Sequence, residues 1–343
     1  MFVYSNYYEK RKQGGDMGVF IRSIAAYVPE KRVSNEELSK MVDTSDEWIQ
    51  SHTGIKNRHI CADDEVTSDL AVRAAETAIQ RAEIDKSDIH MVIVATASPD
   101  YSGLPSTASI VQDKLGLENA GAFDLVAGCT GFVYGLETGR GLLTGGRMKN
   151  VLVLGVETLS RITNWADRNT CVLFGDGAGA AVLSRDDDHA DSILDSELRS
   201  EGSGAQHLIR KAGGSSEPIN LETTKQEDLY IQMNGRQVYN FAVRVNTEVI
   251  QGLLDRNNIT VEDLRWIVPH QANIRIIQAA AKRLKLPMDK FFTNIHEYAN
   301  TSAASIPIAL NELYETDQIR RGDYILLTGF GAGLSYGGNL LRW

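Results

Sequence analysis

The sequence predicts an α/β protein made of two similar halves, in which helices cover buried sheets. Stretches such as residues 91–96 and 151–155 are continuously apolar, and strands of that kind must be covered on both faces. Residues 81–94 and 256–268 repeat one pattern: a helix end, an isoleucine, an aspartate and an apolar strand. Both halves also end alike, in a Phe-Gly-x-Gly turn before a final strand.

The first half alternates strands and helices. Its helices begin at favourable capping residues such as Ser34, and the apolar positions of its long helix fall on one face. In chain order we expect a strand at 19–28, helical segments at 34–42 and from residue 44, an amphipathic helix at 67–82, a strand ending at 94, a buried strand at 121–126 and a helix over about 130–143.

The second half repeats this order after an acidic turn at residues 186–188. A long helix over about 235–256 precedes the apolar strand that ends at Val268, whereas residues 201–228 are rich in glycine and serine and predict a surface loop. We therefore divide the chain into a first half at 17–187 and a second half at 188–343. Residues 1–16 are polar and aperiodic, so we expect a tail there, or a true start at Met17.

Composition excludes several classes of protein. A net charge of −10 argues against a nucleic-acid binder, and no apolar run approaches the roughly 20 residues that span a membrane. The N-terminus has no apolar signal-peptide core, which predicts a cytoplasmic protein. The three cysteines are far apart, so we expect neither a disulfide framework nor a metal site.

Cys129 is the candidate nucleophile. It stands between a predicted strand and a predicted helix, and Gly128 and Gly131 beside it allow a tight bend. A thiol at a helix N-terminus faces free N–H groups and the positive end of the helix dipole, and both favour the thiolate. A small buried core residue is the alternative, and this stretch alone does not separate the two.

His270 and Asn300 are the candidate partners. His270 follows the end of a buried strand, where open α/β sheets place their sites, whereas the other six histidines lie in polar or turn contexts. In the repeat, Cys129 corresponds to about position 304, close to Asn300. If the halves pack about a pseudo-twofold axis, we expect the two equivalent helix starts to meet in one site.

Taken together, three motifs resemble β-ketoacyl-acyl carrier protein synthase III, a family of the thiolase superfamily. They are Cys129 in its turn, Pro269-His270-Gln271-Ala272-Asn273, and Asn300-Thr301-Ser302-Ala303-Ala304-Ser305. The resemblance covers residues 17–343 and includes Phe174-Gly-Asp-Gly-Ala-Gly-Ala-Ala-Val182. It implies a thiolase-like fold with layers in the order α-β-α-β-α.

The resemblance also implies a two-step reaction without a cofactor, with coenzyme A thioesters as substrates. Cys129 takes an acyl group from acyl-CoA, and malonyl-acyl carrier protein then loses CO₂ and condenses with it. His270 Nε2 and the Asn300 amide would stabilise the enolate, and the backbone N–H groups of Cys129 and Ala332 would form the oxyanion hole. The family usually has glycine at the position of Ala332.

Further residues match binding positions of the family. Trp48, Thr53 and Arg168 match coenzyme A contacts. Without the resemblance, the sequence around Trp48 would favour a buried anchor of its helix. Arg275 matches both a coenzyme A contact and, with Lys282 and Arg283, the basic patch that meets the acidic carrier protein. The resemblance implies a homodimer in which Leu104 reaches the partner subunit's acyl tunnel.

The sequence departs from the family pattern at three further places. His52 stands where the family usually has an arginine that contacts coenzyme A, and Leu104 replaces a common phenylalanine. A smaller side chain at 104 could admit longer or branched primers, at a discrimination of about 1–3 kcal/mol per methylene. Tyr298-Ala299 replaces the usual His-Gly before Asn300.

Two other functions stay open. One is a related condensing or acyl-transfer enzyme of secondary metabolism, and the other is a catalytically silent acyl-CoA-binding partner subunit. The intact Cys129, His270 and Asn300 argue against the silent subunit. The glycine-rich segments that start at Gly175 and Gly329 approach a dinucleotide fingerprint, but each leads into a strand, so we reject NAD binding.

Overall fold

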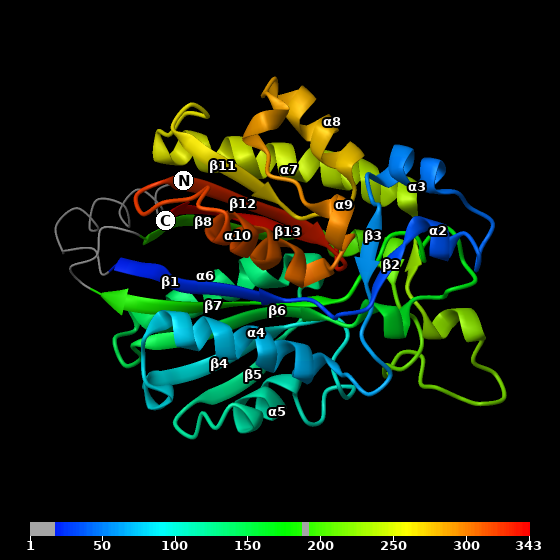
Figure 1. The fold of residues 1–343 in the computed structure, drawn as a ribbon, viewed down its shortest axis with the longest axis horizontal. Coiled ribbons are helices and arrows are strands. Elements are labelled where there is room, and N and C mark those ends of the chain that lie inside the picture. Colours follow the sequence, from blue (N-terminus) through cyan, green and yellow to red (C-terminus); the bar gives the residue numbers. More distant parts are fainter. Residues whose placement is uncertain (1–17, 187–191) are drawn as a thin grey trace.

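The structure is a computed structural model that describes residues 18–186 and 192–343 and is built around two sheets (Figure 1). In the first sheet β4 runs parallel to its neighbours β5 and β6, and β7 lies antiparallel to both β6 and β1. Its strand order is β1 (Gly18–Tyr27), β7 (Gly177–Asp186), β6 (Asn150–Glu157), β4 (Ile89–Ala95) and β5 (Gly121–Leu125).

The second sheet repeats the order of the first. Strand β11 runs parallel to β12, and β13 lies antiparallel to both β12 and β8. The order is β11 (Leu264–Pro269), β12 (Tyr324–Gly331), β13 (Ser335–Arg342) and β8 (Ser192–Ser200). A single parallel bridge between Ile267 and Phe291 stands where the first sheet has β5. The predicted duplication is therefore present, with one strand reduced to a bridge.

Helices form three layers around and between the two sheets (Figure 1). In the middle layer, Phe132 and Leu136 of one helix and Leu310 of the other belong to a core shared with both sheets. This burial of apolar side chains is the main stabilising contribution to the fold. The layers are α4 (Thr67–Ala82) with α5 (Thr107–Lys114), then α6 (Gly131–Thr144) with α10 (Ser305–Glu315) between the sheets, and α7 (Gly235–Asn257) with α8 (Ile274–Leu284) outside.

The remaining elements are short, and Figure 1 shows α2, α3, α9, β2 and β3 together at one end of the layers. Ser34 caps α2 through its side chain, as predicted, but α2 ends at Leu38 and not at residue 42. Ser45 caps α3, which begins two residues after the predicted start at residue 44. These elements are β2 (Arg32–Ser34), α2 (Asn35–Leu38), α3 (Asp46–Thr53), β3 (Asn57–His59), β9 (Leu208–Ile209), β10 (Gln232–Met233) and α9 (Ile295–Tyr298).

Most predicted element bounds agree with the structure to within one or two residues. The predicted helix 67–82 coincides with α4, and both glycine-rich segments lead into strands, β7 and β13. The predicted tail at 1–16 and the division between residues 187 and 188 lie outside the described residues. Among the described residues, no helix is both long enough and apolar enough to cross a membrane.

Candidate active site

Cys129 lies in a 3-10 turn, Gly128–Thr130, that joins β5 to α6. Gly128 has φ +54°, a backbone conformation that glycine adopts without strain. A Cβ on Gly131 would lie 2.7 Å from the Cβ of Ala95, so the missing side chain lets α6 begin directly against β4. The predicted strand-to-helix turn at Cys129 is confirmed.

The surroundings of Cys129 work against the thiolate that the helix start favours. Burial raises the pKa of the Cys129 thiol to about 12; the Ser302 hydroxyl works against this rise, and the negative charge of Glu157 adds to it. Cys129 is partly exposed to the cavity, but its surroundings are largely apolar. A helix dipole, worth about 0.3–1 kcal/mol, shifts a pKa by less than about one unit, whereas desolvation can shift it by several units. The thiol is therefore protonated at neutral pH.

His270 directly follows β11 and is 2% exposed. Its backbone N–H donates to the carbonyl of Thr328 at 2.8 Å, and its Nδ1 lies 2.7 Å from Ser305 Oγ. The Nε2 atom is buried and has no hydrogen-bond partner among the described residues. Because burial lowers the pKa of His270 to about 3, the ring is a neutral imidazole with one nitrogen open to a bound molecule.

Asn300 lies between α9 and the 3-10 turn Ser302–Ala304, which leads into α10. Its backbone forms a parallel bridge with Phe174, and its Oδ1 accepts a hydrogen bond from the Ser302 N–H at 2.9 Å. With Oδ1 engaged, the Nδ2 hydrogens are the donors that Asn300 can offer to a ligand. The turns at 128–130 and 302–304 contact each other, so the two equivalent helix starts meet as the repeat predicts.

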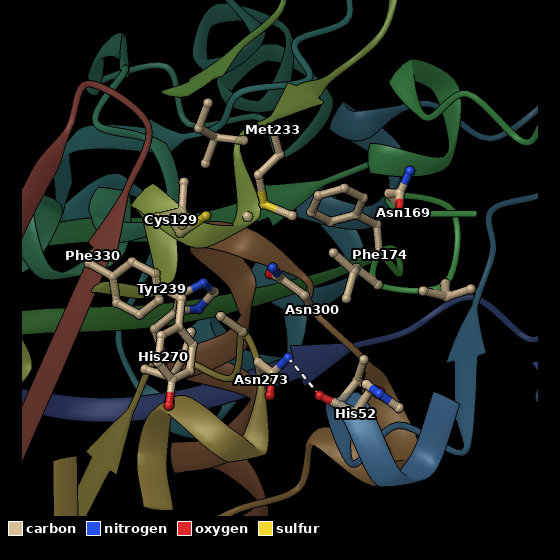
Figure 2. Close-up of a pocket in the computed structure, with 18 of the residues that line it drawn as sticks. His52, Cys129, Asn169, Phe174, Met233, Tyr239, His270, Asn273, Asn300 and Phe330 are labelled. Atoms are coloured by element: carbon tan, nitrogen blue, oxygen red, sulfur yellow. Dashed lines mark hydrogen bonds between the residues drawn. The ribbon is translucent and has the colours of Figure 1, made fainter. Parts of the chain in front are cut away.

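The three candidate catalytic side chains line one cavity of about 240 Å³ (Figure 2). Cys129, His270 and Asn300 come from three different segments and face the same space in this view. Of the three cysteines, Cys129 alone lines the cavity, and Cys61 and Cys171 are buried elsewhere. The rest of the wall is largely apolar and includes Val172, Leu173, Phe174, Leu208, Met233, Val238, Ala272, Ile276 and Phe330.

The backbone of the β12–β13 turn lies directly against the Cys129 turn. A Cβ on Gly128 would lie 2.6 Å from the backbone nitrogen of Ala332, and a Cβ on Gly331 would collide with the backbone nitrogen of Cys129. Both turns therefore depend on glycine for their close approach. This contact brings the two expected oxyanion-hole nitrogens, those of Cys129 and Ala332, to neighbouring positions.

Trp48, His52 and Thr53 of α3 line the outer part of the same cavity. The ring of Trp48 stacks on that of His52, with centroids 4.4 Å apart, and the Arg168 guanidinium lies 4.7 Å from the Trp48 centroid. Trp48 is half-buried, so it does not act only as a core anchor. Thr53 is buried and its hydroxyl donates to the Ile49 carbonyl at 2.6 Å.

The α3 helix is tied to the start of α8 at the cavity entrance. Asn273 Nδ2 donates to the His52 carbonyl at 3.1 Å, which Figure 2 marks, and Arg275 Nε donates to the Ser51 carbonyl at 3.0 Å. Arg275, Lys282 and Arg283 are all exposed on α8. They give the rim of the cavity and the adjacent surface a positive charge.

Leu104 lies apart from the residues that line the cavity of its own chain. Its side chain is 90% exposed, in the loop between β4 and α5. A role in the acyl pocket of this subunit has no support in the single chain, and only a contact with a second subunit would give Leu104 such a role.

Two residues of the site carried no role in the sequence analysis. Ser305 contacts the ring of His270, and the Phe330 ring packs edge-on against it, with centroids 5.4 Å apart. Both stood in recognised motifs, but a serine that opens a helix and a phenylalanine that ends a strand are ordinary residues at those places. Their function depends on a contact across the two segments that the sequence pattern does not specify.

Comparison with protein families gives two matches along the chain. The family described as 3-oxoacyl-[acyl-carrier-protein (ACP)] synthase III matches residues 123–202, and the C-terminal part of the same family matches residues 254–343. The first match includes Cys129, and the second includes His270 and Asn300.

Individual relatives cover nearly the whole chain. A β-ketoacyl-[acyl-carrier-protein] synthase III of Caldanaerobacter subterraneus is 49% identical over 94% of this chain and 97% of its own. The crystal structure of 3-oxoacyl-[acyl-carrier-protein] synthase III from Aquifex aeolicus superposes with a TM-score of 0.87 at 41% identity, over 95% and 100% of the two chains. The priming β-ketosynthase of the R1128 polyketide pathway superposes with a TM-score of 0.86 at 32% identity, over 95% and 96%.

Proposed function

Because the chain belongs to the β-ketoacyl-[acyl-carrier-protein] synthase III family, we propose that it catalyses the initiating condensation of type II fatty acid synthesis. An acyl-CoA primer acylates Cys129, and a decarboxylative condensation with malonyl-acyl carrier protein then gives 3-oxoacyl-acyl carrier protein, CO₂ and CoA. The chain is an acyltransferase with the thiolase-like fold.

One observation carries this proposal. A thiol, an imidazole nitrogen without a partner among the described residues and a carboxamide line the same cavity. A silent acyl-CoA-binding subunit has no chemical need for all three groups. A buried polar atom without a partner is costly in a folded protein, so Nε2 of His270 is best explained as a donor kept for substrate.

In the first step the sulfur of Cys129 attacks the thioester carbonyl of acyl-CoA. The carbon–sulfur bond to coenzyme A breaks, and the thiol proton ends on the coenzyme A sulfur, so the step is balanced without a cofactor. The backbone N–H groups of Cys129 and Ala332 would donate to the oxyanion of the tetrahedral intermediate, where one such donor is worth about 2.7–4 kcal/mol. Neither donor depends on a side chain, so alanine at 332 preserves this function.

In the second step the malonyl group of the carrier protein loses CO₂. The enolate oxygen that forms would accept hydrogen bonds from Nε2 of His270 and Nδ2 of Asn300, and the enolate carbon attacks the thioester on Cys129. The product leaves with the new carbon–carbon bond, and the Cys129 thiolate takes a proton from solvent. The raised pKa of Cys129 favours this return to the thiol.

The entrance of the cavity fits coenzyme A and an acidic carrier protein. In our proposal Trp48 and Arg168 hold the adenine, with Thr53 and Arg275 beside them. The Trp48 ring stacks on His52, which replaces the family arginine, and lies 4.7 Å from the Arg168 guanidinium, so we expect Arg168 to move off the ring when the adenine enters. The exposed cations Arg275, Lys282 and Arg283 would steer the carrier protein to the entrance.

We also propose that the protein works as a cytoplasmic homodimer. Strand β5 is an edge of the first sheet, and Leu104 and Val126 near it are 90% and 80% exposed. Exposed edges and apolar surface of this kind favour association. All three cysteines are free thiols, which fits the reducing environment of the cytoplasm.

The test of this function is product analysis. The protein is incubated with acetyl-CoA and malonyl-acyl carrier protein, and 3-oxoacyl-carrier protein is measured by mass spectrometry, with other malonyl acceptors compared in parallel. We expect product with the carrier protein. A higher rate with a different acceptor would instead favour a specialised enzyme of secondary metabolism.

Asn300→Ala separates the two steps in the same assay. We expect acylation by acetyl-CoA to be preserved and malonyl decarboxylation to fall by about 10²–10³-fold, the usual effect of removing one oxyanion donor. Asn311→Ala in α10 is the matched control. The side-chain Oδ1 of Asn311 accepts a hydrogen bond from Arg81 at 2.8 Å, and Asn311 does not line the cavity. An unchanged condensation rate in Asn300→Ala would refute the role of Asn300.

A further inference from the structure

Ser305 is the first residue of α10, and its hydroxyl faces the ring nitrogen of His270 that points away from the cavity. Ser305 Oγ lies 2.7 Å from His270 Nδ1, and both side chains are 2% exposed. A hydrogen bond between two groups this deeply buried has no competition from water, so its direction decides where the imidazole carries its proton.

The hydrogen bonds around Ser305 determine that direction. The backbone N–H of Gln271 donates to Ser305 Oγ at 3.4 Å, so the hydroxyl oxygen already has one donor. The hydroxyl hydrogen then needs an acceptor, and Nδ1 of His270 is the one found for it among the described residues. If Nδ1 carried the proton instead, the Ser305 hydrogen would be buried without an acceptor, which is unfavourable.

With Nδ1 as the acceptor, the proton of the neutral ring is on Nε2. That atom is the buried one without a hydrogen-bond partner, on a ring that lines the cavity. The opposite tautomer would present a lone pair to the substrate, and a lone pair repels an enolate oxygen. The tautomer therefore determines whether His270 can act as a donor.

We propose that Ser305 is a positioning residue that holds His270 in its Nε2–H tautomer, so that the ring can donate to the enolate oxygen during malonyl decarboxylation. This inference rests on the proposed function, since it concerns the second step of that reaction. Asn300 and Ser305 stand on one short segment, residues 300–305, and Asn300 lines the cavity. This segment thus supplies one donor, the Asn300 amide, and through Ser305 it determines the tautomer of the second donor, His270.

The test uses a graded series at position 305 in the full-length protein. Ser305→Cys keeps a weak donor of similar size, and Ser305→Ala removes the donor. In Ser305→Ala we expect the rate of malonyl decarboxylation to fall by about 10- to 100-fold, as when a supporting partner of a functional histidine is lost. Ser305→Cys should lie between Ser305→Ala and the parent protein. The rate of acylation by acyl-CoA should change by less than about twofold in both variants.

Nitrogen-15 NMR of histidine-labelled protein reports the tautomer directly. The parent protein should show protonated Nε2 and unprotonated Nδ1 for His270, with the signal identified by its loss in His270→Ala. In Ser305→Ala the Nδ1–H form should gain population. Ser184→Ala is the matched control, because this buried hydroxyl donates to Asn150 at 2.6 Å in the other half of the chain and should change neither rate nor tautomer.

The result that overturns the inference is an Nδ1–H tautomer in the parent protein, or normal decarboxylation in Ser305→Ala. A fall in acylation equal to the fall in decarboxylation would also overturn it, because it would show general damage to the site. If the parent protein failed to condense any malonyl substrate, the proposed function would fail, and the NMR spectrum would still decide the tautomer.

Discussion

Burial decides the charge state of the two titratable residues in the cavity. Desolvation raises the pKa of Cys129 to about 12 and lowers that of His270 to about 3, so both side chains are neutral over the physiological range. A neutral pair cannot form a thiolate–imidazolium ion pair like that of the cysteine proteases. Here the imidazole is suited to donate a hydrogen bond, and the thiol is suited to become a leaving group that is readily protonated again.

The pKa of Cys129 leads to a prediction about alkylation by iodoacetamide, which reacts with the thiolate. Below its pKa the thiolate fraction rises about tenfold per pH unit, so the rate at Cys129 should climb from pH 6 to pH 9.5 with no plateau. Peptide-resolved mass spectrometry measures this rate and separates Cys129 from Cys61 and Cys171. A plateau below pH 8 would contradict the burial argument and restore the thiolate expected from the helix dipole.

At the scale of elements, the segment between α9 and α10 contains a backbone conformation that most residues avoid. Ala299 is fully buried and has φ +57° and ψ −156°, a region that favours glycine. The bridge between Asn300 and Phe174 and the hydrogen bond from Gly175 N–H to the Asn300 carbonyl hold the segment in place. Contacts with neighbouring segments therefore hold the segment that positions Asn300 in place, although alanine at 299 disfavours this backbone conformation.

Ala299→Gly should stabilise the protein by about 0.5–1 kcal/mol. Relief of the backbone conformation is worth about 1–3 kcal/mol. Two costs reduce this gain: the entropy of about 0.4–1 kcal/mol that glycine adds to the unfolded chain, and about 0.8 kcal/mol for the lost burial of the methyl group. The measurement is the thermal unfolding midpoint, which should rise. Ala78→Gly is the matched control, since Ala78 is also fully buried but lies in α4, where glycine costs about 1 kcal/mol. A lower midpoint for Ala299→Gly would mean that residue 299 is not strained.

The elements themselves were largely predictable from the sequence, because their signals are local. The apolar face of α4, the cap at Ser34 and the repeat of strand patterns follow from spacing and residue type. The meeting of the two helix starts followed from the repeat. The protonation of Cys129 and the role of Ser305 did not. The desolvation of Cys129 depends on how the segments around it pack, and the Ser305–His270 contact joins residues that lie 35 positions apart within the second half.

At the scale of the whole molecule, one surface of the chain has the features of an interface. The edge strand β5 has no neighbour on its outer side among the described residues. Val126 directly after this strand, and Tyr101 and Leu104 in the loop between β4 and α5, are exposed apolar side chains. Joining two copies at this edge would cover these side chains and place Leu104 against a second subunit. The polar outer surface of α8, by contrast, suits a transient partner such as a carrier protein.

Light scattering tests the dimer. The parent protein should have twice the 37.8 kDa mass of the chain. Leu104→Asp should shift the population toward the monomer, because a charge at this surface would be buried without a partner. Leu221→Asp is the control, as Leu221 is 99% exposed on a different loop and should leave the mass unchanged. A parent protein that is monomeric at micromolar concentration would refute the homodimer and the proposed contact of Leu104.

The most direct test of the whole account is intact-mass spectrometry of the acyl-enzyme. The protein is mixed separately with acetyl-, isobutyryl- and octanoyl-CoA, and malonyl-acyl carrier protein is added afterwards. We expect a gain of one acyl group that maps to Cys129, disappears when the malonyl-carrier protein is added and is absent in Cys129→Ala. The primer that reacts best would show whether leucine at 104 is compatible with longer or branched acyl chains. No gain with any of the three thioesters, or a gain that persists in Cys129→Ala, would contradict the assignment of Cys129 as the nucleophile of a condensing enzyme.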